Sequence, residues 1–133
     1  MGMSASWVTA AIEGASSEVA IRIGASHTLS ARQSDDGDAG APGPTPVDLL
    51  LASLGACTAL TLKRYAASRG WSLEVVEVDL EVTSRQASVS VTRLLSLRGS
   101  LDPSQREELL AVAEHSPVTL LLAPGARIHT ELA

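Results

Sequence analysis

Apolar residues at the start of the chain follow the short, alternating pattern of β-strands. They form a run over residues 7–12, alternate with other residues over 19–23, and recur over 27–31. Gly14 and the small residues after it lie between the first two runs and favour a hairpin turn. The pattern therefore predicts three antiparallel strands in the first part of the chain.

An uncharged apolar stretch over residues 49–62 predicts a long central helix. The preceding Thr45-Pro46-Val47-Asp48 supplies a hydroxyl N-cap, a proline for the first turn and an acid that completes a capping box. The helix is expected to end near Ser68, before Gly70. The stretch is shorter than a bilayer span, so we expect no membrane crossing. Its leucines surround the helix axis, which one small sheet cannot cover, and this predicts a homodimer.

The second half of the chain predicts two more strands, two helices and a final strand. Residues 76–82 and 87–97 alternate between apolar and polar side chains. Further segments are predicted as a helix opened by Asp102-Pro103 and ending near His115, a short helix from Ser116-Pro117 to Leu122, and a strand over 127–132. This order of elements is α+β, with antiparallel sheets around a long central helix.

The length of 133 residues predicts a single domain over residues 1–133. Residues 34–45 are rich in Asp, Gly and Pro, a composition that favours turns. We therefore expect a flexible loop of lid-like length before the central helix.

Composition excludes several classes of function. A net charge of −5 without a long basic cluster argues against nucleic acid and anionic membranes as partners. Cys57 is the only cysteine, so an intrachain disulfide and a multi-thiolate metal site are both excluded. The three histidines are scattered, and we expect no metal and no bound cofactor. No signal peptide is evident, and the chain is expected to be cytoplasmic.

Cys57 is the first candidate for chemistry, because a thiol is the strongest nucleophile in the chain. Small neighbours, Gly55, Ala56 and Thr58, would leave room for a substrate. The alternative is a buried cysteine that acts as a small hydrophobic residue. Activation of the thiol would require a nearby Arg, Lys or His, because the residue lies too far into the helix to be activated by the N-terminal dipole.

The segment GPTPVDLLLASLGACT, residues 43–58, resembles the signature helix of the OsmC/Ohr family, the osmotically inducible and organic hydroperoxide resistance proteins. The segments around Gly70-Trp71, the helix after Pro103 and AEHSPV at 113–118 agree with this resemblance. The resemblance implies an OsmC-like fold and an intertwined homodimer whose active sites lie at the subunit interface.

The resemblance also implies roles for individual residues. Cys57 matches the cysteine that attacks the peroxide and becomes a sulfenic acid. Ser116 falls at the position of the second cysteine, which resolves that acid as a disulfide, so the two-cysteine cycle is unavailable here. A serine before a proline also has a plain explanation as a helix N-cap. Val47 stands where the peroxidases carry the glutamate that pairs with an arginine, and Asp48 is one position away.

No motif identifies the arginine that would activate the thiol. Arg32 is the first candidate for approaching Cys57 of the same or the partner chain, and Arg22 is the alternative, although either could be a solvated or ion-paired side chain. His115 could bond near Cys57 or be solvated at a helix end. His129 shares the polar face of the predicted last strand and is expected to be exposed.

The sequence favours two functions over a third, that of a structural or regulatory partner protein with no pocket function, for which no specific feature argues. The first is an OsmC-like redox protein that reduces or senses organic hydroperoxides in the oxidative stress response through Cys57. As a degenerate thiol peroxidase it would need an external thiol reductant. The second is a non-catalytic dimer that binds a small apolar ligand in its interface pocket.

Overall fold

The computed structural model describes residues 7–32, 43–84 and 89–133. The chain divides into two compact units, residues 1–50 and 51–133. The prediction of a single domain stays a prediction. Most of the loop expected over residues 34–45 lies outside the described residues.

The first unit contains a three-stranded antiparallel sheet in the order β1-β2-β3. Its strands are β1 (Val8–Ala11), β2 (Glu18–Ile23) and β3 (His27–Arg32). Gly14 and Gly24 adopt φ values of 59° and 60° in the two connections, a conformation that glycine enters without steric cost. The three strands predicted from the alternating pattern are confirmed.

Helix α1 (Pro46–Ser68) begins with the predicted capping box. The backbone N–H of Thr45 donates to Asp48 Oδ2 at 3.0 Å, and the N–H of Asp48 donates to Thr45 Oγ1 at 3.1 Å. At the other end Gly70 adopts a φ of 71° and turns the chain out of the helix. Both predicted ends of the helix are confirmed.

The second unit pairs β4 (Ser72–Ser84) with β5 (Ser90–Ser100) in an antiparallel hairpin, followed by α2 (Pro103–Ala113) and α3 (Pro117–Leu122). The Asp102 carboxylate accepts from Gln105 N at 2.7 Å, and Gln105 Oε1 accepts from Asp102 N at 2.9 Å. The two predicted hairpin strands are confirmed over the described residues, and residues 87 and 88 of the second one lie outside them. The capping box and both helices are also confirmed.

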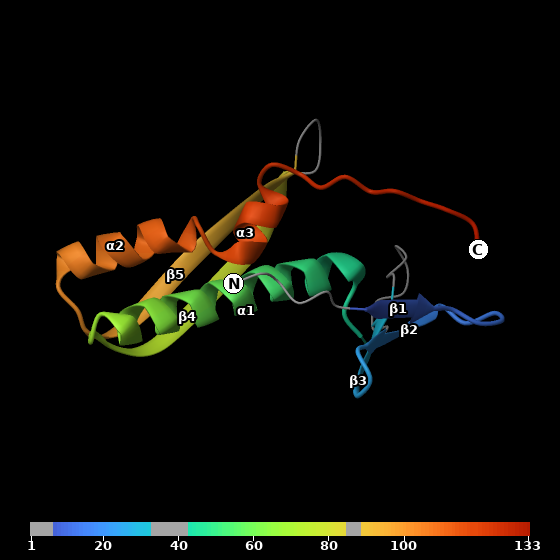
Figure 1. The fold of residues 1–133 in the computed structure, drawn as a ribbon, viewed down its shortest axis with the longest axis horizontal. Helices are drawn as coiled ribbons and strands as arrows, with labels where there is room; N and C mark the ends of the chain where they lie inside the picture. Colours follow the sequence, from blue (N-terminus) through green and yellow to red (C-terminus); the bar gives the residue numbers. More distant parts are fainter. Residues whose placement is uncertain (1–6, 33–42, 85–88) are drawn as a thin grey trace. The chain divides into compact units, whose positions relative to one another are not determined.

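In the second unit α1, the β4-β5 hairpin and α2 lie next to one another (Figure 1). One aliphatic core joins them. Its buried members are Leu62, Ala66, Leu73, Leu109 and Ala113. Alternation on β5 turns Arg93, Leu95, Leu97 and Gly99 inward and leaves the residues between them exposed. Because Arg93 occupies the same phase as the core leucines, a charged side chain is brought against α1 and α3.

The strand predicted over residues 127–132 is wrong. In the described part of the second unit these residues form no strand, and every side chain after Leu122 is exposed. A segment with an alternating pattern forms a strand only where a neighbouring strand supplies partners for its backbone hydrogen bonds. No strand pairs with this segment within the described unit.

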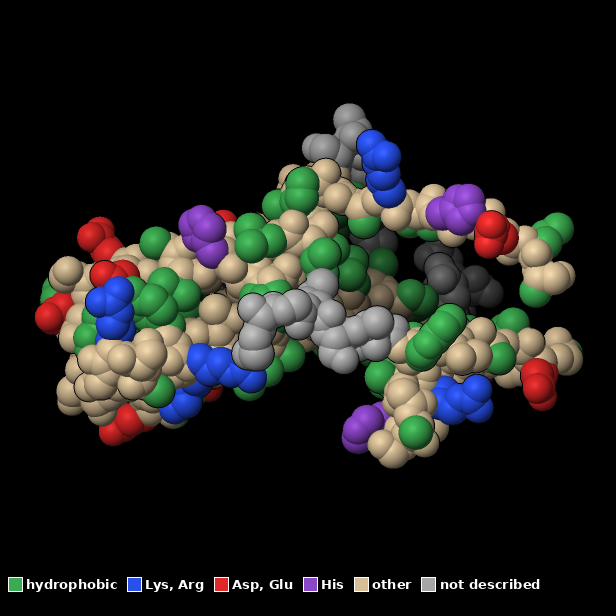
Figure 2. Space-filling view, viewed as in Figure 1, with side chains coloured by type: hydrophobic (Ala, Val, Ile, Leu, Met, Phe, Trp, Pro, Cys, Tyr) green, Lys and Arg blue, Asp and Glu red, His purple; other side chains and the backbone are tan. Residues whose placement is uncertain are grey.

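Several hydrophobic side chains of the second unit remain at its surface, over α2 and α3 among other elements (Figure 2). More than half of the surface of each of these is exposed: Leu60, Leu94, Leu110 and Leu120. By length and composition alone, the helix over Pro46–Arg69 is also long and apolar enough to cross a membrane. That is weak evidence, because the core helix of a soluble protein passes the same test.

Candidate functional site

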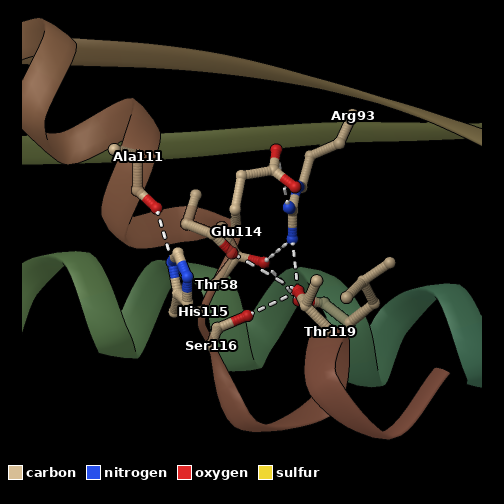
Figure 3. A network of polar contacts seen from close by, with 9 residues as sticks. Thr58, Arg93, Ala111, Glu114, His115, Ser116 and Thr119 are labelled. Carbon is tan, nitrogen blue, oxygen red and sulfur yellow. Dashed lines mark hydrogen bonds and ion pairs between the residues drawn. The ribbon is translucent and has the colours of Figure 1, made fainter. Parts of the chain in front are cut away.

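A connected polar cluster of the second unit centres on Arg93 (Figure 3). Its side chain extends from β5 toward α1 and α3 and is 12% exposed. One nitrogen, Nη1, donates to Thr58 Oγ1 at 3.0 Å and to Thr119 Oγ1 at 2.8 Å. A hydrogen bond to a charged group contributes about 1.5–3 kcal/mol. Arg93 therefore links a strand and two helices at one point.

Thr58 brings this cluster beside the candidate nucleophile. It is fully buried on α1 and directly follows Cys57 in the chain. Its hydroxyl donates to the carbonyl oxygen of Leu54 at 2.7 Å and accepts from Arg93. The helical turn that carries Cys57 is thus bonded to Arg93 through the neighbouring side chain.

Ser116 enters the same cluster from the start of α3. It is fully buried, and its hydroxyl lies 2.7 Å from Thr119 Oγ1. Ser116 occupies the N-cap position as predicted, but its side chain makes no capping hydrogen bond. The nearby Thr119 hydroxyl is its partner instead. Ser116 is therefore linked to Thr58, the residue after Cys57, through Thr119 and Arg93.

Glu114 and His115 lie at the edge of the cluster. Glu114 Oε1 is 3.6 Å from Arg93 Nη2, and its side chain is 66% exposed, so this ion pair contributes about 0–1 kcal/mol. His115 is exposed, and its Nδ1 lies 3.1 Å from the carbonyl oxygen of Ala111. The predicted solvation of His115 at a helix end agrees with this exposure. The exposure predicted for His129 is confirmed, and its Nε2 lies 3.2 Å from Glu131.

Cys57 itself is a free, half-buried cysteine. Its thiol makes no hydrogen bond within the described residues, whereas the hydroxyl of Thr58, the next residue, has two partners. A half-buried thiol is accessible enough to meet a small electrophile. Its role as the attacking group stays a prediction.

A shallow groove of about 380 Å³ lies between α1 and α2. Its lining residues are Thr61, Tyr65, Glu108, Ala111, Val112 and His115. The Tyr65 hydroxyl donates to Glu108 Oε2 at 2.6 Å, and this hydrogen bond, together with burial, raises the pKa of Tyr65. Cys57 and Thr61 are four residues apart, so they lie on one face of α1 a single turn apart.

Arg32, the predicted activator, belongs to the first unit. Its Nη2 donates to Ser17 Oγ at 2.9 Å, and its buried Nε has no partner among the described residues. Its approach to Cys57 stays a prediction, and so does that of Arg22. Among the described residues, no group of three or more His, Cys, Asp or Glu side chains is placed to hold a metal ion.

Sequence reasoning missed Arg93 and its partners Thr58 and Thr119. A signal for Arg93 was available, because it stands in the apolar phase of a strand, two residues before Leu95 and four before Leu97. The two threonines carried no comparable signal, because each lies far from Arg93 in the sequence. Thr119 is 26 positions from Arg93, and Thr58 is 35 positions from it.

The fold, with a long helix beside an antiparallel hairpin, is an α+β fold of the OsmC-like class. The family model for OsmC-like proteins matches residues 36–131. The chain therefore belongs to the OsmC-like protein family. No curated protein matches it.

Solved structures agree with this fold. An OsmC-like protein from Mycoplasma pneumoniae has a TM-score of 0.76 at 13% identity, covering 88% of this chain and 86% of its own. The organic hydroperoxide resistance protein OhrB of Bacillus subtilis has a TM-score of 0.64 at 20% identity, covering 87% and 88%. A third structure comes from Legionella pneumophila and is described as an organic hydroperoxide resistance protein OsmC and predicted redox protein. It has a TM-score of 0.63 at 19% identity, covering 90% of each chain. The expected α+β, OsmC-like fold is confirmed.

Proposed function

We propose that this chain is a single-cysteine thiol protein that reduces or senses organic hydroperoxides through Cys57 in the oxidative stress response. The observation that carries the proposal is the position of Cys57 on the central helix of an OsmC-like chain. It is half-buried and directly precedes Thr58, which accepts a hydrogen bond from Arg93. The structural neighbours named for hydroperoxide resistance support the same class of substrate.

The proposed chemistry is a two-electron oxidation of the sulfur. The Cys57 thiolate attacks the outer oxygen of the hydroperoxide, the O–O bond breaks, and the alkoxide leaves with a proton as the alcohol. Cys57 becomes a sulfenic acid. An external thiol then displaces water to form a mixed disulfide, and a second thiol releases reduced Cys57 together with the external disulfide. Ser116 has no sulfur to take the place of that external thiol.

Rapid oxidation of Cys57 by an organic hydroperoxide is the expected result. Mass spectrometry of the dimedone-trapped sulfenic acid, after exposure to tert-butyl hydroperoxide, measures the rate. We expect the protein to react at least about tenfold faster than an unactivated thiol peptide, because redox-active thiols are held as thiolates. The Cys57→Ser variant, which has no thiol, is the negative control. A rate equal to that of the peptide would rule out the redox function.

A second function, binding of a small apolar ligand without chemistry, is favoured by one observation. The groove between α1 and α2 is lined by Ala111, Val112 and the ring of Tyr65, beside the face that carries Cys57. If Cys57 is oxidised no faster than the thiol peptide and an aliphatic alcohol binds saturably to this groove, that alternative is favoured.

We also propose that the protein is a cytoplasmic homodimer. Support comes from α1, whose Leu50 and Leu60 remain 47% and 58% exposed in the single chain. Covering such side chains with a second copy would remove apolar surface from water, at about 25 cal/mol per Å². Support for the cytoplasm comes from the lone free cysteine, which suits a reducing compartment.

Sedimentation velocity at micromolar concentration should therefore show a species with twice the chain mass of 13.8 kDa. Leu60→Glu places a charge among the apolar side chains and should shift the species toward the monomer. Leu94→Glu on β5 is a control with a similarly exposed leucine outside α1. A folded monomer for the unmodified chain would contradict the dimer.

A further inference from the structure

We propose that Arg93 is a positioning residue for Cys57, and that it acts through Thr58 rather than by touching the sulfur. The inference rests on the proposed hydroperoxide reaction and adds to it a residue whose role is to hold the reacting turn in place. Its basis is the geometry of the hydrogen bonds at the end of the Arg93 side chain.

The first step concerns the Thr58 hydroxyl. It has one proton, which is committed to the carbonyl oxygen of Leu54 at 2.7 Å. The hydroxyl can therefore only accept from Arg93, which donates at 3.0 Å. Hydrogen bonds from threonine to a carbonyl four residues earlier adjust the local bend of a helix. Arg93 thus fixes a bond that spans the turn from Leu54 to Thr58, within which Cys57 lies.

The second step concerns α3. The Arg93 nitrogen that binds Thr58 also donates to Thr119 at 2.8 Å, and Thr119 is bonded to the buried Ser116. A single nitrogen therefore sets the spacing between the Cys57 turn and the start of α3. Loss of the guanidinium would leave the two helices without this polar link.

The third step concerns the support under Arg93 itself. Its register partner on β4 is Leu80, whose Cδ1 would be 2.9 Å from a Cβ built on Gly55. Gly55 and Thr58 are three residues apart and share one face of α1. Close packing of the hairpin on α1 thereby confines Arg93, and a group held by rigid elements can position a reacting residue.

The test compares two rates at Cys57. The first is oxidation by tert-butyl hydroperoxide, which requires an aligned approach to the O–O bond. The second is alkylation by iodoacetamide across pH, which reports thiolate formation and access. We expect Arg93→Met to slow oxidation about 10- to 100-fold, since small misplacements of reacting groups cost up to about 10²-fold. The alkylation rate should stay within about twofold of the unmodified protein at every pH.

Three further variants make the comparison specific. Arg98→Met is the matched control, because Arg98 lies on the same strand, is 69% exposed and pairs with Glu77 at 3.7 Å. Thr58→Val should slow oxidation as much as Arg93→Met does, and the double variant should be no slower than either single one. Arg93→Lys keeps the charge and should recover part of the rate.

Each outcome decides the inference. If the unmodified protein is oxidised rapidly and the oxidation rates of Arg93→Met and Arg98→Met are equal, the positioning role is overturned and the proposed function stays intact. Oxidation and alkylation that change in parallel would show a merely structural role and would also overturn it. A slow wild-type protein would end both the proposed function and this inference. If Arg93→Met does not fold, Arg93→Lys and Thr58→Val carry the same comparison.

Discussion

Replacing Ser116 with cysteine should convert the oxidised protein from a sulfenic acid to an intrachain disulfide. Ser116 is linked to Thr58, the neighbour of Cys57, through Thr119 and Arg93. Because the sequence resemblance puts Ser116 at the position of the second cysteine, we expect the Cα atoms of residues 57 and 116 to lie within about 7 Å, the limit for a disulfide. The introduced thiol would attack the Cys57 sulfenic acid, form the S–S bond and release water.

The substitution should cost little stability. The Ser116 side chain makes no capping hydrogen bond, so no cap is lost. Its hydrogen bond with Thr119 would be lost, at about 0.5–1.5 kcal/mol. A thiol is a weaker hydrogen-bonding group than a hydroxyl and is accepted well in protein cores.

Intact-mass analysis after one equivalent of hydroperoxide should show the loss of two hydrogens and of both free thiols. Ser104→Cys is the matched control, because Ser104 is exposed near the start of α2 and lies most of that helix away from Ser116, at about 1.5 Å per residue. A folded Ser116→Cys variant that accumulates only sulfenic or sulfinic acid at Cys57 would show that the two positions are not adjacent.

The Gly99→Ala variant should lose about 3 kcal/mol or more of its free energy of unfolding. Gly99 has a φ of 151°, which side chains rarely adopt, and lies where the register of the hairpin shifts between Leu73 and Val75. A Cβ at this position would collide with the Ser72 carbonyl oxygen and would lie 3.1 Å from the backbone nitrogen of Glu74. Both obstacles are backbone atoms, so relief requires the strands to separate beside the core residue Leu73.

Urea unfolding followed by circular dichroism measures this loss. Gly70→Ala is the control, because Gly70 also has a positive φ, 71°, but a Cβ there meets no atom within 4 Å. The control should therefore show only the conformational cost, about 1–2 kcal/mol. Equal losses in the two variants would mean that the contact with Ser72 is not the cause.

The sequence predicted the elements whose signals are local. Thr45 and Asp48 mark the start of α1, and Asp102 with Gln105 marks the start of α2, because capping groups bond to the backbone within one turn. The final strand was wrong because alternation alone does not supply a partner strand. Arg93 was missed because its partners lie on two other elements, and only its phase on β5 indicated an inward direction.

The β4-β5 hairpin has a consequence for how the chain folds. Its pairs extend from Ser84 and Ser90 outward to Ser72 and Ser100, and α1 and α2 flank it directly in sequence. Closing such short loops costs little chain entropy, and domains with mainly local contacts fold quickly. We therefore expect α1, the hairpin and α2 to form the folding nucleus, so that Arg93 reaches Thr58 early in folding.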